Sequence, residues 1–215
     1  MVVLFRLVYC APTDKQGDPT LLVECDDVDD LYFDSRVGAD LRRMGVGGFM
    51  TEWGAMQGDA KALQNIDHLT SLADAKKQSW TYWQFKSFHD ITTASVGPAE
   101  SFYDQNGALY TDKVTRLART YPPIVAGEPL SWAFNITSGK FTLKFAPSDA
   151  PGNSTTVINF ANGNRGIGHY PNGVSVSISP SSSQVNITQP YSGRVAITVA
   201  PNSGIEQLTV ELVAL

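Results

Sequence analysis

The hydrophobic pattern of this chain changes near Pro122-Pro123. Before that point, apolar residues occur in short runs that alternate with stretches of helical spacing. After it, they alternate one by one with polar residues. The first pattern is typical of βαβ units and a parallel sheet, and the second of an antiparallel sandwich. Residues 1–120 hold 12 basic and 17 acidic groups, whereas residues 121–215 hold four of each. The sequence therefore predicts an α/β domain at 1–120 and an all-β domain at 121–215.

The first domain is predicted to contain three strands and three helices. The strands are expected at 2–9, 45–55 and 79–85, and the helices at 33–44, 63–77 and 111–120. Apolar residues three and four positions apart indicate the helices, and Gly45 ends the first of them. Residues 86–110 form a long polar connection of a kind that often carries function.

The second domain is predicted to be a sandwich of seven short strands. Clusters of glycine, proline and asparagine separate its apolar runs. The runs lie at 130–134, 141–145, 157–160, 174–178, 185–187, 195–199 and 208–212. Short strands at this spacing favour two antiparallel sheets packed face to face.

A carboxylate stands near the end of the predicted strand 45–55. The sequence GVGGFMTEWGA places Glu52 where a buried parallel strand would reach the surface. Barrel enzymes carry their chemistry at the carboxyl ends of such strands, where a carboxylate can act as nucleophile or base. A solvated acid at a strand end is the alternative interpretation. The tryptophan-rich strand SWTYWQF at 79–85 favours the functional one.

The composition argues against several classes of function. A formal net charge of −5, with no basic stripe, argues against a nucleic-acid partner. The sequence contains no run of 18 apolar residues, so it predicts no membrane-spanning helix. No metal-binding cluster, phosphate-binding glycine loop or Ser–His–Asp arrangement is recognised, so no cofactor is expected. The four aspartates within 26–30 are assigned to a solvated loop or a helix N-terminus, because a calcium loop needs a glycine and a closing glutamate that this spacing lacks.

Three N-glycosylation sequons lie in the second half, at Asn135, Asn153 and Asn186. They favour a secreted or lysosomal glycoprotein. Cys10 and Cys25 flank a turn-rich segment, and they are the only two cysteines. A disulfide between them would close a loop of about 15 residues, which the chain-entropy model values at roughly 3 kcal/mol. Two free thiols are the alternative.

Three motifs follow one another at the expected strand ends and at the domain boundary. They are TEWG at 51–54, WTYWQFK at 80–86, and Tyr121-Pro122-Pro123 leading to LSWAF at 130–134. Together they resemble endoglycoceramidases of glycoside hydrolase family 5, which are retaining enzymes with a TIM (β/α)8 barrel and a C-terminal β-sandwich. The resemblance covers roughly residues 30–215. It implies that residues 1–120 hold about the last three strands of a catalytic barrel.

The resemblance also implies roles for individual residues. Glu52 would be the nucleophile at the end of the seventh barrel strand, and Trp83 would form the aromatic floor of the sugar subsite on the eighth. Lys86 would reach a sugar hydroxyl. Tyr9 would be the tyrosine of a His–X–Tyr motif that holds the nucleophile, with Leu7 in place of the histidine. The implied partner is a glycolipid or oligosaccharide, and a lipid tail allows peripheral contact with a membrane.

The sequence also departs from that family. The acid/base glutamate of these enzymes follows an asparagine, and no Asn-Glu pair occurs here. With about three barrel strands, the chain is expected to be the C-terminal part of a longer glycosidase and to be inactive alone on glycosphingolipids. Two alternatives stay open: a noncatalytic carbohydrate- or lipid-binding module, and another family 5 β-glycosidase that acts on a glucan or a simple glucoside.

Overall fold

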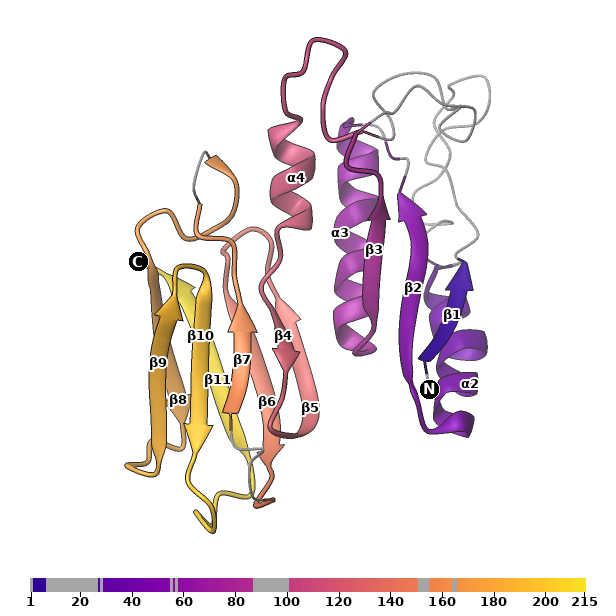
Figure 1. Ribbon diagram of the computed structural model, residues 1–215. Helices are drawn as coiled ribbons and strands as arrows, with labels where there is room; N and C mark the ends of the chain where they lie inside the picture. The colour runs from indigo at the N-terminus through magenta and orange to yellow at the C-terminus, as the bar shows by residue number, and fades with distance from the viewer. Residues whose placement is uncertain are drawn as a thin grey trace. The chain divides into compact units, whose positions relative to one another are not determined.

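The structure is a computed structural model that describes residues 2–6, 27, 29–54, 56, 58–86, 101–150, 155–163 and 166–215. The chain divides into two compact units, Met1–Leu117 and Ala118–Leu215 (Figure 1). This division falls three residues before the predicted one at 120/121. The predicted disulfide between Cys10 and Cys25 lies outside the described residues.

A parallel sheet of three strands organises the first unit. It consists of β1 (Val2–Arg6), β2 (Gly47–Gly54) and β3 (Ser79–Trp83), in the order β1-β2-β3. Both neighbouring pairs are parallel, so the arrows of the three strands run the same way in Figure 1. The predicted alternation of strand and helix is confirmed. The predicted first strand extends to residue 9, and residues 7–9 lie outside the described part of the chain.

The helix predicted at 33–44 consists of two parts. A π-helix, η1 (Tyr32–Val37), leads directly into α2 (Gly38–Met44). The N–H of Gly38 donates to the carbonyl oxygen of Phe33, five residues earlier, as a π-turn requires. A Cβ at position 38 would lie 2.6 Å from that same oxygen. Glycine therefore permits the close turn, which the apolar spacing alone does not reveal.

Two further helices complete the first unit. The long helix α3 (Ala60–Ala75) begins after Asp59, whose carboxylate accepts hydrogen bonds from the N–H groups of Lys61 and Ala62 at 2.9 and 3.0 Å. Such an N-cap satisfies donors that the first helical turn leaves free. The short helix α4 (Thr111–Leu117) follows later in the chain. No helix among the described residues is long and apolar enough to cross a membrane.

The helices cover one face of the parallel sheet. Phe33 from η1 shares a buried cluster with Leu63 and Ile66 from α3, and with Met50 and Trp53 from β2. Because one cluster joins both helical segments, both pack on the same side. Sequential parallel strands with helices on one face correspond to a segment of a barrel, since a doubly wound sheet carries helices on both faces. Strand residues that alternate with those of this cluster project from the opposite face of the sheet.

The second unit is an antiparallel β-sandwich (Figure 1). One sheet has the order β4-β7-β10-β9, formed by β4 (Tyr121–Ile124), β7 (Thr155–Asn159), β10 (Arg194–Val199) and β9 (Val185–Tyr191). The other has the order β5-β6-β11-β8, formed by β5 (Gly127–Phe134), β6 (Phe141–Pro147), β11 (Leu208–Ala214) and β8 (Val174–Ser179).

The described part of the second unit has eight strands, so the prediction of seven is wrong by one. The missed strand is β4, whose sequence YPPI contains two adjacent prolines. Proline cannot donate to a strand ladder, so it is confined to sheet edges and similar positions. In the structure, β4 is an edge strand, paired on one side with β7.

Aliphatic and aromatic side chains from both sheets fill the sandwich. Fully buried examples are Ile158 and Ile197 in one sheet and Leu143 and Val210 in the other. Tyr170, in the segment before β8, is also buried and is 1% exposed. Its hydroxyl donates to the carbonyl oxygen of Gly139 at 2.6 Å and lies 2.9 Å from the hydroxyl of Thr120. Burial raises the pKa of Tyr170, opposed by the hydrogen bond with Thr120.

Candidate functional site

A β-bulge in the central strand of the parallel sheet coincides with the TEWG motif. Between Met50 and Trp53 the strand β2 advances three residues, while its partner β3 advances two, from Trp80 to Tyr82. The extra residue lets Met50 and Trp53 both join the cluster under α3. The residues between them, Thr51 and Glu52, therefore point away from the helices.

The tryptophan of the motif fixes this geometry. Trp53 is fully buried, and its ring meets those of Trp80 at 5.4 Å and Tyr82 at 5.1 Å in edge-to-face contacts. Edge-to-face aromatic pairs contribute stability beyond the area they bury. The hydroxyl of Tyr82 accepts a hydrogen bond from the N–H of Met56 at 3.3 Å. Trp53 thus anchors the end of β2 to α3, and Glu52, its half-buried neighbour, lies on the open face.

The neighbouring strand places a second tryptophan on that open face. Trp80 and Tyr82 pack towards α3, so alternation directs Thr81 and Trp83 to the other side. Trp83 is 39% exposed, at the last position of β3. The Thr81 hydroxyl donates to the carbonyl oxygen of Thr51 at 2.7 Å and ties the two strands together. Glu52 and Trp83 therefore share one face at the carboxyl ends of adjacent parallel strands.

The glycine of the motif has a steric reason. Gly54 pairs directly with Trp83 and has a φ of 133°. Residues with a Cβ rarely adopt this backbone conformation. A Cβ at position 54 would lie 2.2 Å from the carbonyl oxygen of Trp83. Gly54 thus allows the backbones of β2 and β3 to approach closely just beyond Glu52.

A group of aromatic side chains follows Trp83. Phe85 is 57% exposed, and its ring contacts those of Phe102 at 6.0 Å and Tyr103 at 5.5 Å. Phe102 also contacts Tyr82 at 5.5 Å, and its N–H donates to the carbonyl oxygen of Phe85 at 3.1 Å. Phe102 and Tyr103 were not predicted as site residues, because residues 86–110 have the composition of a polar connection. The signal was the aromatic pair within that polar stretch.

A buried lysine holds this aromatic segment to α4. The side chain of Lys113 is 1% exposed, and its Nζ donates to the carbonyl oxygen of Ser101 at 3.2 Å. The same Nζ lies 5.2 Å from the centre of the Tyr110 ring. Burial lowers the pKa of Lys113 from 10.5 to about 8. The segment that carries Phe102 and Tyr103 is therefore tied to the following helix.

The four predicted site residues have different positions. Glu52 and Trp83 lie on the same sheet face, as described above. Lys86 is exposed in the bend after β3, and Tyr9 lies outside the described residues. Among the residues that the structure describes, no group of three or more His, Cys, Asp or Glu side chains could hold a metal ion. The assigned roles of these four residues stay predictions.

Comparison with known proteins identifies relatives of both units. Residues 119–211 match the glycoside hydrolase family 5 C-terminal domain. Endoglycoceramidases from Cyanea nozakii and Hydra vulgaris are each 31% identical to this chain, over 67% and 70% of it. Those matches span 28% and 27% of the length of the two relatives.

Solved structures of endo-glycoceramidase II from Rhodococcus sp. have the same fold. The lactosyl-enzyme intermediate matches all of this chain and 42% of its own, with a TM-score of 0.71 and 16% identity. The ganglioside GM3 complex matches 89% of this chain and 37% of its own, with a TM-score of 0.65 and 18% identity. The fold is thus the C-terminal part of a TIM barrel followed by an antiparallel sandwich. The chain is an endoglycoceramidase-like member of glycoside hydrolase family 5 and corresponds to the C-terminal portion of its relatives.

Proposed function

We propose that this chain is the nucleophile-bearing portion of a retaining glycosidase that cleaves the bond between oligosaccharide and ceramide in glycosphingolipids. The observation that carries the proposal is the placement of Glu52 and Trp83 on one face at the carboxyl ends of β2 and β3. Barrel enzymes carry out catalysis at that end. Two relatives are endoglycoceramidases, and the related Rhodococcus enzyme has been solved as a lactosyl-enzyme intermediate and as a complex with ganglioside GM3.

In the proposed reaction, the ionised carboxylate of Glu52 attacks the anomeric carbon and forms a covalent glycosyl ester. The bond to the ceramide oxygen breaks, and that oxygen takes a proton from a general acid. Water then attacks the same anomeric carbon and gives a proton to the same group, and the bond from this carbon to the Glu52 oxygen breaks, which releases the carboxylate. The two carboxyl groups must lie about 5–5.5 Å apart. The second group must come from outside these residues if it follows an asparagine, because the sequence contains no Asn-Glu pair.

The surrounding aromatic residues suit the proposed substrate. The face of Trp83 can pack against the apolar C–H face of a pyranose and limit water access to the developing positive charge. Phe85, two residues further along the chain, adds exposed aromatic surface, which suits an apolar aglycone. Lys86 is proposed to donate to a sugar hydroxyl, and Tyr9 to hold the Glu52 carboxylate. Both roles rest on the family resemblance alone.

The nucleophile can be tested in a chimera that supplies a complete barrel. The C-terminal portion of the Cyanea nozakii endoglycoceramidase is replaced by this chain, and oligosaccharide release from a ganglioside is measured. Glu52→Gln is expected to lower kcat by at least about a thousandfold, because the amide cannot form the ester. A 2-deoxy-2-fluoro glycosyl fluoride should label the Glu52 peptide, as detected by mass spectrometry.

Glu128→Gln is the matched control, since this exposed carboxylate lies on β5 of the sandwich. It should leave both hydrolysis and labelling unchanged. If the chimera keeps its activity with Glu52→Gln, Glu52 is not the nucleophile. The 215-residue chain alone is expected to release no oligosaccharide, and Glu52-dependent release by the chain alone would show that it needs no further residues.

A noncatalytic carbohydrate-binding module is the second candidate, favoured by a polar and aromatic pocket on the sandwich. For either function we propose the secreted or lysosomal route. Its support is the position of two sequon asparagines, Asn135 and Asn186, which are exposed on the sandwich, whereas Asn153 lies outside the described residues. Glycosidase digestion of the protein from its native source, followed by mass analysis, tests that route.

A further inference from the structure

Four side chains form a row across one sheet of the sandwich. Tyr121 on β4 lies opposite Asn159 on β7, Asn159 opposite Arg194 on β10, and Arg194 opposite Tyr191 on β9. Directly opposite residues of antiparallel strands project to the same face. Ile158, next to Asn159, is fully buried in the core. The row of Tyr121, Asn159, Arg194 and Tyr191 therefore lies on the outward face.

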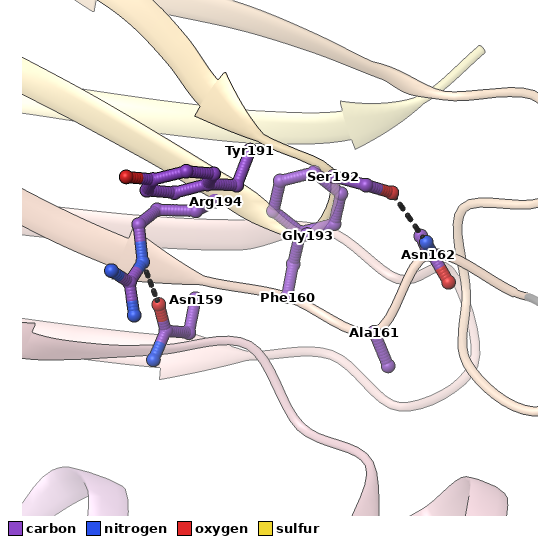
Figure 2. A pocket seen from close by; sticks show the side chains of 8 residues that line it. All are labelled: Asn159, Phe160, Ala161, Asn162, Tyr191, Ser192, Gly193 and Arg194. Carbon is purple, nitrogen blue, oxygen red and sulfur yellow. Dashed lines mark hydrogen bonds between the residues drawn. The ribbon is translucent and has the colours of Figure 1, made fainter.

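Hydrogen bonds order the row and leave one end of the guanidinium free. The side-chain Nδ2 of Asn159 donates to the Tyr121 hydroxyl at 3.4 Å, and the Nε of Arg194 donates to the Asn159 Oδ1 at 3.0 Å (Figure 2). The guanidinium lies 5.9 Å from the centre of the Tyr191 ring. No described residue accepts a hydrogen bond from the two Nη atoms of Arg194 or forms an ion pair with it. In Figure 2 these two nitrogens lie at the end of the Arg194 side chain, on the side away from Ser192 and Asn162.

A pocket of about 430 Å³ lies beside this row, entirely within the sandwich. It is lined by residues 159–162, which begin at the last residue of β7, and by residues 191–194, which comprise the turn between β9 and β10 and the strand residue on each side of it. The N–H of Phe160 donates to the carbonyl oxygen of Gly193 at 2.9 Å. Asn162 donates to the Ser192 hydroxyl at 2.6 Å across the pocket (Figure 2). The two walls are thus joined by hydrogen bonds before any ligand arrives.

The lining favours an acidic sugar. Arg194 is the one charged residue among the eight that line the pocket, so the pocket is positive in a protein of net charge −5. The two free Nη donors match the two oxygens of a carboxylate, which a guanidinium binds bidentately. The side chains of Asn162 and Ser192 suit sugar hydroxyls, and the exposed ring of Tyr191 suits a C–H face. The volume falls in the range of small-molecule sites.

We infer that this pocket binds a carboxylate-bearing sugar of a glycan, with Arg194 holding the carboxylate. The inference goes beyond the proposed hydrolase function, because the pocket lies within residues 118–215 and uses neither Glu52 nor Trp83. Tyr191 is 69% exposed, so the ligand can reach the row from solvent. A site of this kind would retain the glycan chain of a sialylated or otherwise acidic substrate.

The test is a titration of the 215-residue chain by NMR and calorimetry with the methyl glycoside of N-acetylneuraminic acid. Saturable binding is expected, and methyl galactoside, a neutral sugar, should bind at least about tenfold more weakly, since charge-assisted hydrogen bonds are the strong ones. Arg194→Gln should weaken binding of the acidic sugar at least about tenfold, with amide shifts lost at residues 159–162.

Thr198→Val is the matched control, because Thr198 lies on the same strand and the same face, hydrogen-bonded to Thr155 at 3.1 Å. It should leave the affinity within about twofold. No saturable binding by a folded chain, equal binding of the neutral sugar, or unchanged binding with Arg194→Gln would each overturn the inference. Loss of binding with Glu52→Gln would mean that the ligand binds in the first unit. That result would overturn the inference and leave the hydrolase proposal unaffected.

Discussion

The two units bury their sheets in different ways. In the sandwich, each sheet covers the inner face of the other, so the fully buried residues Leu143 and Ile197 lie between two layers. In the first unit, helices cover one face of the parallel sheet, and the other carries Glu52 and Trp83. A sheet that closes its own core needs no further element, whereas a parallel sheet is normally buried on both faces. The sandwich therefore has a closed core, whereas the face of the parallel sheet that carries Glu52 and Trp83 is the one to which we assign the proposed chemistry.

The largest expected effect of this difference is on independent folding. Residues 118–215 expressed alone should give a dispersed amide spectrum and one cooperative unfolding transition, because their core is complete. Residues 1–117 expressed alone should give neither, because the helices that the structure describes there pack on only one face of their sheet. Circular dichroism melts and NMR spectra of both segments check this. A noncooperative melt of 118–215, or a cooperative one of 1–117, would reverse the comparison.

A smaller effect concerns the buried hydroxyl of the sandwich. Tyr170→Phe removes the donor to Gly139 and the partner of Thr120, and leaves their polar atoms in a buried site. An unsatisfied buried group costs about 1–3 kcal/mol, so the free energy of unfolding should fall by that amount. Urea unfolding of residues 118–215 measures it.

Tyr191→Phe is the control for that prediction. Its ring is largely exposed, and no described residue forms a hydrogen bond with its hydroxyl. The free energy of unfolding should change by less than about 0.5 kcal/mol. Equal effects of Tyr170→Phe and Tyr191→Phe would mean that the buried hydrogen bonds contribute no net stability to the sandwich.

The contrast between the units also explains what could be predicted from the sequence. The residues proposed for catalysis in the first unit lie within contiguous motifs, because a parallel strand presents such residues at its carboxyl end. TEWG and SWTYW therefore locate Glu52 and Trp83 on neighbouring strand ends. The steric role of Gly54 needs the structure, since it depends on the carbonyl of Trp83 in the next strand.

The pocket of the sandwich could not be predicted in the same way. Tyr121 and Asn159 become neighbours through strand pairing, and Arg194 joins them from a third strand. The alternation of apolar and polar residues along each strand does not reveal which residues of different strands lie opposite one another. The prolines of β4 further concealed the strand that supplies Tyr121. Alternation predicts which residues face outwards, but only the order of the strands brings these outward residues into one row.

A pH-dependent effect is predicted for Lys113, the buried ammonium of the first unit. Below pH 8 this group is protonated in both folded and unfolded states, so its contribution does not vary with pH. Between about pH 8 and 10.5 the unfolded chain keeps the proton that the folded chain has released. The free energy of unfolding should therefore rise with pH in this interval, by at most about 1.4 kcal/mol per unit.

Lys113→Met should remove that rise, whereas Lys144→Met, at an exposed lysine of the sandwich, should keep it. Urea unfolding of the whole chain at several pH values, with each variant compared against the parent chain, measures the difference. Parallel pH profiles for the parent and Lys113→Met would mean that the ammonium reaches water in the folded protein, so that the first unit is open to solvent around α4.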